Sequence, residues 1–141
     1  MTNSLPGVSR PLVPIFLVVC ALALAACGTT TSTANFKGTE HEVAQTIANL
    51  QSDVSAGEEK KICANDLAAA VVTRLGGQQR CQSTVKDQLA EIDNTELQVE
   101  SVKVTGATAT ATVKSNYSGK KRATSVSLAK EGEKWKIVSL Q

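Results

Sequence analysis

The sequence contains few aromatic residues: one tryptophan, one tyrosine and two phenylalanines among 141 residues. The core must therefore be built from valine, leucine, isoleucine and alanine. Sites that bind organic ligands are usually lined by apolar and aromatic side chains together. This chain offers little aromatic material for such a site, and it has no interleaved aromatic residues on which the bases of a nucleic acid would stack.

Groups that carry catalysis or hold cofactors are also scarce. His41 is the single histidine, and we expect it to face solvent, because it is out of phase with the apolar positions that follow it. No serine–histidine–acid set can be assembled, and no glycine-rich phosphate loop, metal-ligand cluster or nucleotide fingerprint is present. The sequence therefore predicts no catalytic residue, no metal and no cofactor, and it favours a protein that is not an enzyme.

No apolar run reaches the length of about 20 residues that a membrane-spanning helix needs. The run from Leu12 to Ala26 is shorter, and Pro14 interrupts it. Arg10 is the one charged residue before it, which is typical of the short positive region of a secretory signal. We therefore expect the protein to be exported.

The run ends in Leu24-Ala25-Ala26-Cys27, which resembles the lipobox of bacterial lipoproteins. The resemblance implies that residues 1–26 are a signal peptide and that the Cys27 thiol carries a diacylglyceryl group. The mature protein would then be anchored by lipid in the cell membrane and face its extracytoplasmic side. An ordinary secretory signal that happens to end near a cysteine is the alternative.

The cysteines agree with export. Cys20 leaves with the signal and Cys27 is acylated, so Cys63 and Cys81 remain. Two cysteines in an oxidising compartment favour one disulfide, which would close a loop of about 18 residues and stabilise the fold by about 3 kcal/mol. A metal pair or a reactive thiol is the alternative, but a metal would need further ligands.

Charge is distributed unevenly along the chain. Residues 27–100 hold 6 Lys and Arg against 11 Asp and Glu, whereas residues 101–141 hold 8 against 2. Lys120, Lys121 and Arg122 are consecutive, and further basic residues are expected on the same sheet: Lys103, Lys114, Lys130, Lys134 and Lys136. These residues would either contact an anionic surface or form a solvated face that discourages aggregation.

The segment Gly28–Gly38 is small and polar, so residues 27–38 are predicted to be the acylated cysteine and a flexible tether. A single domain follows at residues 39–141. Thr39 and Glu42 fit a capping box at the start of a first helix, and Gly57 would end it. The apolar stripe of this helix comprises Val43, Ile47, Leu50 and Val54.

Two further helical regions are predicted before residue 94. The first spans about 58–75, with a break at Asn65-Asp66 and an end at Gly76-Gly77. Its inner residues are Ile62, Leu67, Val71 and Leu75. The second spans about 82–92, and the disulfide would join the two regions.

The pattern then changes to the alternation that is typical of strands. Strands are predicted at about 96–104, 107–113, 122–130 and 134–140, and a change of parity in the first indicates a bulge. The inward positions include Ala109, Ala111, Val113, Val126, Leu128, Trp135 and Ile137. Helices followed by hairpin-linked strands predict an α+β fold, with the N-terminal helices packed on a curved four-stranded antiparallel sheet.

This order of elements, the Cys63/Cys81 pair and the ending GEKWKIVSLQ resemble the nuclear transport factor 2-like (cystatin-like) superfamily, and within it small bacterial lipoproteins. The resemblance covers residues 36–141 and says little about function, because this fold hosts enzymes, binding modules and assembly domains. Enzymes of the superfamily, such as ketosteroid isomerases, use Asp, His or Tyr between the sheet and the helices. Here Tyr117 falls at a hairpin tip, and four aspartates are expected to be solvated or to cap helices: Asp53, Asp66, Asp87 and Asp93.

Two hypotheses follow from the sequence. The first is a lipid-anchored module without catalytic activity that binds a protein or a cell-envelope component, with a homodimer through the sheet as one form, and with no nucleic acid as partner. The second is a binder of a small apolar ligand, or a degenerate ketosteroid-isomerase-like enzyme, with a pocket between sheet and helices. An enclosed cavity would favour the second, and a filled core the first.

Overall fold

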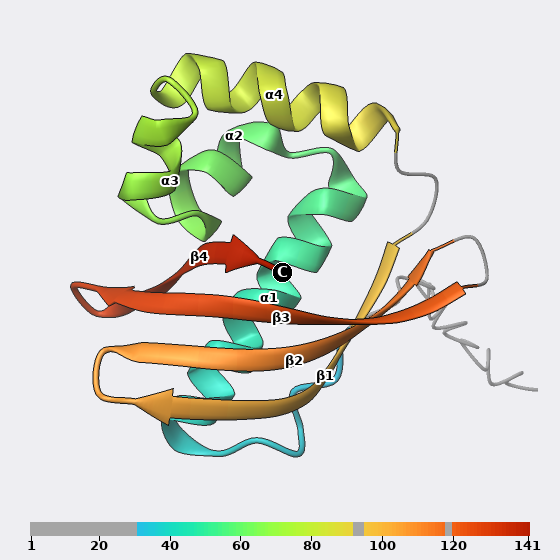
Figure 1. Ribbon diagram of the computed structural model, residues 1–141, viewed down its shortest axis with the longest axis vertical. Helices are drawn as coiled ribbons and strands as arrows, with labels where there is room; N and C mark the ends of the chain where they lie inside the picture. Colours follow the sequence, from blue (N-terminus) through green and yellow to red (C-terminus); the bar gives the residue numbers. More distant parts are fainter. Residues whose placement is uncertain (1–30, 92–94, 118–119) are drawn as a thin grey trace, which may run out of the picture.

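The computed structural model describes residues 31–91, 95–117 and 120–141 (Figure 1). The predicted signal peptide, Cys27 and Asp93 lie outside the described residues. The helical elements are α1 (Gly38–Ala56), α2 (Glu59–Lys61), the π-helical turn η1 (Ile62–Asp66), α3 (Ala69–Arg74) and α4 (Gln78–Ala90). The strands are β1 (Thr95–Thr105), β2 (Thr108–Tyr117), β3 (Lys120–Glu131) and β4 (Lys134–Leu140). This order confirms the predicted α+β organisation.

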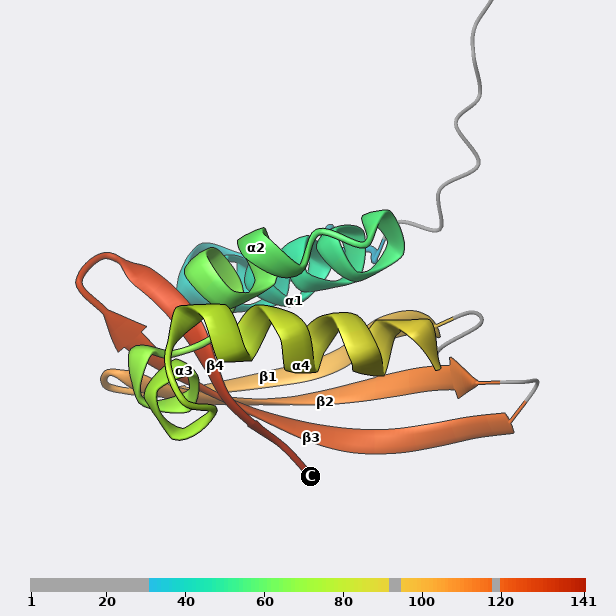
Figure 2. The same ribbon diagram turned by 90° about the horizontal axis from the view of Figure 1, so that it is seen from above.

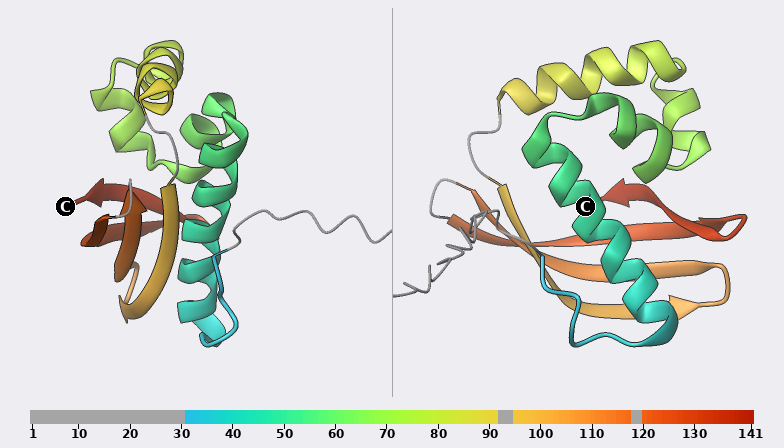
Figure 3. Two further views of the ribbon diagram at one scale, coloured as in Figure 1. Left: turned by 90° about the vertical axis from the view of Figure 1, so that its right-hand side faces the viewer. Right: turned by 180° about the vertical axis from the view of Figure 1, so that it is seen from behind.

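The strands form one antiparallel sheet in the order β1-β2-β3-β4. The pairing of β1 with β2 shifts between Val99 and Ser101, which confirms the predicted bulge. A second shift, between Ser127 and Leu128 in the pairing of β3 with β4, has no counterpart in the sequence prediction. Figures 2 and 3 show α1 packed across one face of the curved sheet, as predicted, while α3 and α4 lie beyond the β4 edge.

Helix α1 lies across the sheet and supplies much of the core (Figure 3). Its predicted stripe is confirmed, because Val43, Ile47 and Leu50 are buried. On β2, small side chains face inward, and Ala109 and Ala111 are both buried. Side chains of this size leave room for a helix to pack close to the strands. The helix ends as predicted, at a glycine in the left-handed conformation, Gly57 (φ 66°).

The predicted capping box at the start of α1 is wrong. The helix begins at Gly38, and Lys37 precedes it without a side-chain cap hydrogen bond, so Thr39 lies inside the first turn. The indole N–H of Trp135 donates instead to Glu42 Oε2 at 3.3 Å. Trp135 is buried, and a buried indole N–H needs an acceptor. Glu42 therefore acts as a tertiary partner of Trp135 and not as part of a cap.

The predicted helical region 58–75 is divided close to the expected break. Residue Leu67 is extended and forms a parallel bridge with Ile137. The N–H of Ala68 donates to the carbonyl of Ile137 at 2.9 Å. This backbone contact covers the edge of β4 that β3 leaves open. After α3, Gly77 (φ 90°) precedes α4, which begins four residues before the predicted position.

The described part of the predicted tether, residues 31–37, contacts the domain. Thr31 Oγ1 donates to the carbonyl of Leu97 at 2.8 Å. The N–H of Leu97 donates to Gln51 Oε1 at 3.0 Å, so both backbone groups of this β1 residue are held from outside the sheet. Phe36 packs, half-buried, against the core. A free tether therefore does not extend as far as Gly38.

Candidate functional site

An apolar cavity of about 370 Å³ lies between the helices and the end of β4. This volume is within the range of about 300–1,000 Å³ that is usual for small-molecule sites. Leu50 and Val54 of α1 form one wall. The remaining lining residues come from the segment 62–75, from α4 and from β4: Ile62, Leu67, Val71, Leu75, Val85, Gln88, Leu89, Ile137, Val138, Ser139 and Leu140.

The local structure explains why this space stays open. Ile62, Leu67, Val71 and Leu75 face inward as predicted and line the cavity, and Ile62 also belongs to the buried core. The extended Leu67 holds the start of α3 at the edge of β4, so α3 lies beside the sheet and not over its centre. The half-buried apolar residues of segment 62–75 therefore border a space that α1 does not fill.

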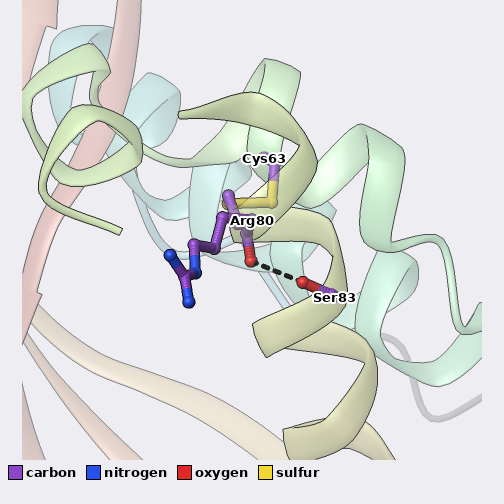
Figure 4. The surroundings of a disulfide bond; sticks show 4 residues. Cys63, Arg80 and Ser83 are labelled. Carbon is purple, nitrogen blue, oxygen red and sulfur yellow. Dashed lines mark hydrogen bonds between the residues drawn. A yellow bond between two sulfur atoms is a disulfide. The ribbon is translucent and has the colours of Figure 1, made fainter. Parts of the chain in front are cut away.

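The Cys63–Cys81 disulfide holds one side of this cavity. The bond is formed, which confirms the prediction, and it joins η1 to the first turn of α4 across 6.1 Å between Cα atoms. Both cysteines are buried, and Ile62 and Val85 beside them line the cavity. Figure 4 shows the Arg80 side chain directed away from the sulfur atoms and the Ser83 hydroxyl donating to the Arg80 carbonyl at 3.0 Å. The disulfide therefore limits how far η1 and α4 can separate.

The chemistry of the cavity lining is that of a binding site. Gln88 and Ser139 supply its polar side chains, and every other lining residue is aliphatic. Among the residues that the structure describes, the lining includes no carboxylate, imidazole or amine, and therefore no general acid or base. Leu140 is 57% exposed. Its exposed surface extends the apolar wall to the protein exterior.

The most perturbed titratable group lies next to the cavity, in η1. Asp66 was expected to be solvated or to cap a helix, but it is 3% exposed. Its burial, and then the charge and hydrogen bond of Asp53, raise the pKa of the Asp66 carboxyl to about 7, while the charge of Lys136 acts in the opposite direction. The Oδ2 atom of Asp66 has no hydrogen-bond partner among the described atoms. The group does not line the cavity.

Lys136 also departs from its predicted position on a solvated sheet face. It is 8% exposed, and its ammonium group donates to the carbonyls of Asn65 and, at 3.2 Å, Ala64. These carbonyls lie in the C-terminal part of η1. A cation favours this position for the same reason that cations favour helix C-termini. Lys136 therefore fastens η1 to β4.

The other candidate catalytic residues do not form a catalytic set. His41 is exposed, as predicted, and its Nδ1 lies 3.2 Å from the Thr33 carbonyl oxygen. It lines a second hollow of about 290 Å³ with Glu42, Trp135 and five further residues. Asp53 is half-buried, Asp87 is exposed, and the side chain of Tyr117 lies outside what the structure describes. Within the described ranges, no group of three His, Cys, Asp or Glu residues could hold a metal ion.

The structure divides the basic residues between the two ends of the sheet. Lys120, Lys121 and Arg122 are exposed at the end where β2 and β3 are joined. Lys103 pairs with Thr110 near the opposite end, and Lys130 and Lys134 lie at the β3–β4 turn there. The Lys130 ammonium is 5.9 Å from the Trp135 ring centroid, and Lys114 forms an ion pair with Glu100. The expected single basic surface is therefore not formed.

With this fold and cavity established, the class of protein can be stated. The family model described as "Putative lumazine-binding" matches residues 56–140, which is more than half of the chain. The protein belongs to this family. No curated protein matches the sequence.

Solved structures are similar to parts of this chain. A protein described as "Putative NTF2-like transpeptidase" from Campylobacter jejuni is 15% identical, with a TM-score of 0.52 over 67% of this chain and 95% of that chain. A de novo designed protein with a curved β-sheet is 17% identical over 45% of this chain and 61% of its own length, with a TM-score of 0.37. The predicted nuclear transport factor 2-like fold is confirmed by the first of these. Among the described residues, no helix is long and apolar enough to cross a membrane.

Proposed function

We propose that this protein is a lipid-anchored, extracytoplasmic binding module without catalytic activity, and that its cavity holds a small aliphatic ligand. The observation that carries the proposal is the cavity of about 370 Å³ with an aliphatic lining. Membership of a family described as lumazine-binding supports a ligand-binding role. Apolar walls with few polar groups favour a ligand that leaves water chiefly through the hydrophobic effect.

The lipid anchor is supported by the sequence Leu24-Ala25-Ala26-Cys27. The Cys63–Cys81 disulfide supports an oxidising compartment, where such bonds persist. An anchored binding module would hold its ligand close to the membrane surface. The absence of acid–base groups from the cavity lining favours binding over turnover, so we expect no reaction of esters, enones or epoxides.

The ligand class is argued from the lining. Lumazine is a fused heteroaromatic ring with several N–H and C=O groups, and each buried polar group needs a hydrogen-bond partner. The cavity offers the side chains of Gln88 and Ser139. An aliphatic chain needs no such partners and matches the leucine, isoleucine and valine walls.

The proposal is tested by displacement of an environment-sensitive apolar fluorophore from the purified protein. We expect saturated fatty acids to displace it with dissociation constants on the order of 1–100 µM, and lumazine not to displace it. Val71→Phe reduces the volume of the cavity and should weaken displacement by the longer fatty acids. Ala70→Phe, on the same helix at an exposed position outside the lining, is the matched control. Displacement by lumazine, or equal binding by both variants, would contradict the aliphatic assignment.

A further inference from the structure

The end of the sheet where β2 and β3 are joined lies next to the point where the chain enters the domain. Thr31 is bonded to the carbonyl of Leu97 on β1. Leu97 pairs with Ser115 on β2, and Ser115 pairs with Arg122 on β3. Neighbouring strands lie about 4.8 Å apart, so the Arg122 backbone is about 10 Å from that of Leu97. Figures 1 and 3 show the segment before α1 starting at this end of the sheet.

The chain between this point and the predicted anchor is short. Thr31 is four residues from Cys27, and four residues span at most about 14 Å when fully extended. A membrane that holds the acyl groups of Cys27 must therefore lie within about 14 Å of Thr31. Thr31 is hydrogen-bonded to the carbonyl of Leu97, and the N–H of Leu97 is hydrogen-bonded to Gln51. Thr31 is therefore fixed to the domain, so the distance limit from the membrane applies to the domain as well.

The charge at this end is positive. Lys120, Lys121 and Arg122 are exposed. The ion pairs formed among the described residues, Lys61–Glu58 and Lys114–Glu100, do not involve them. The carboxylate nearest in register is Glu96, which pairs with Asn116, the residue that also pairs with Lys121. Among the described strand residues at this end, three cations against this one carboxylate leave the sheet surface positive.

We propose that Lys120, Lys121 and Arg122 contact anionic lipid headgroups of the membrane in which Cys27 is anchored, and so fix the orientation of the domain. This inference rests on the proposed anchor. Attraction between exposed charges and a membrane is screened over about 8 Å at physiological ionic strength, and the short connection keeps the three residues close enough to act. Each basic residue at an anionic surface strengthens contact about fivefold.

The anchor keeps the domain at the membrane whether or not the basic residues touch the lipid headgroups. The basic residues therefore act at a high effective concentration of headgroups. The three residues together would raise the ratio of docked to undocked domain by up to about 100-fold.

The docked orientation also has a consequence for the cavity. Figure 2 shows α4, which contributes Gln88 and Leu89 to the lining, running toward the same end of the molecule. That side of the cavity would lie toward the membrane.

The test uses the lipidated protein in vesicles of phosphatidylcholine alone or mixed with phosphatidylglycerol, with amide hydrogen exchange as the readout. Strand β4 ends opposite Val126, so part of the β3 backbone at 120–124 is open to solvent and its exchange reports contact. We expect slower exchange there in anionic vesicles, restored by high salt. Lys120→Gln/Lys121→Gln/Arg122→Gln should remove the protection. Lys103→Gln/Lys130→Gln/Lys134→Gln, with the same loss of charge at the opposite end, should retain it.

Failure of the anchor and failure of the contact give different results. If mass spectrometry finds no acyl group on the N-terminal peptide and the protein does not float with vesicles, the anchor is wrong. This inference is then wrong with it. Acylated protein whose exchange at 120–124 is the same in neutral and anionic vesicles overturns the contact alone. Protection by cell-wall polymer in place of anionic vesicles also overturns it, because the partner would then be the polymer.

Discussion

Leu67 and Ile137 form a parallel bridge between the helical segment and the last strand, reinforced by the Ala68 N–H bond to the Ile137 carbonyl at 2.9 Å. This bridge places α3 beside β4, and both Leu67 and Ile137 line the apolar cavity. The cavity thus depends on a backbone contact between residues 70 positions apart.

Loss of the disulfide should weaken the whole domain. The Cys63→Ser/Cys81→Ser variant is expected to be less stable by about 3 kcal/mol, because the unfolded chain regains the freedom of an 18-residue loop. Urea denaturation measures the change. Reduction of the wild type should reproduce it, and equal midpoints for oxidised and reduced protein would refute the stabilising role.

Stability should depend on the ionisation of Asp66. Its pKa is raised from 3.8 to about 7 in the folded protein, so the folded state holds the proton more tightly than the unfolded state. The contribution is fully present below about pH 4 and is lost as the pH rises through about 7. Asp66→Asn should therefore stabilise the protein by about 1–2 kcal/mol at pH 8, and the gain should shrink toward pH 4.

Denaturation curves at several pH values measure the Asp66 effect. The exposed Asp87 provides the matched control, because Asp87→Asn should leave the pH dependence unchanged. Wild-type and Asp66→Asn proteins whose stabilities change in parallel between pH 4 and pH 8 would show that the buried carboxyl does not carry the effect.

Small side chains under α1 should be intolerant of enlargement. Ala111 is 0% exposed on β2, so Ala111→Leu should destabilise the fold by about 1–3 kcal/mol through overpacking. Ala123→Leu places the same side chain at an exposed position of β3 and should change stability much less. Thermal unfolding of the two variants measures this, and similar melting temperatures would indicate a loosely packed interface.

Acylation of Cys27 remains a prediction from the sequence. Cys27→Ala should release the protein from membranes or leave it with its signal peptide, because the acyl chains supply the membrane affinity. Fractionation and electrophoretic mobility measure the outcome. A variant that fractionates and migrates like the wild type would remove the anchor from the account.

The sequence predicted the fold because its strongest signals are periodic. The stripe of α1 and the alternation at Ala109, Ala111 and Val113 arise from burial on one face, and burial leaves that pattern in the sequence. The capping box failed because Thr39 and Glu42 match a local motif, whereas a distant residue, Trp135, determines what Glu42 contacts. Local motifs do not record such tertiary competition.

The sequence left a pocket between the sheet and the helices as one of two hypotheses, and its pattern could not decide between a pocket and a filled core. Val71 and Leu75 are inward-facing by spacing, and a residue that lines a cavity has the same spacing as one that fills a core. The burial of Asp66 was missed for a related reason: beside Asn65 it is typical of a solvated break, and only the packing of η1 against β4 and Lys136 encloses it.

The central claim, an aliphatic ligand in the apolar cavity, is tested most directly by calorimetric titration of the purified protein with straight-chain fatty acids of increasing length. Each methylene that enters the cavity should tighten binding about fourfold, until the chain fills the space and the affinity levels off, with a negative heat-capacity change. Val71→Phe should shorten the chain length at which the affinity levels off. Affinity that does not depend on chain length, or no measurable binding at any length, would contradict the account.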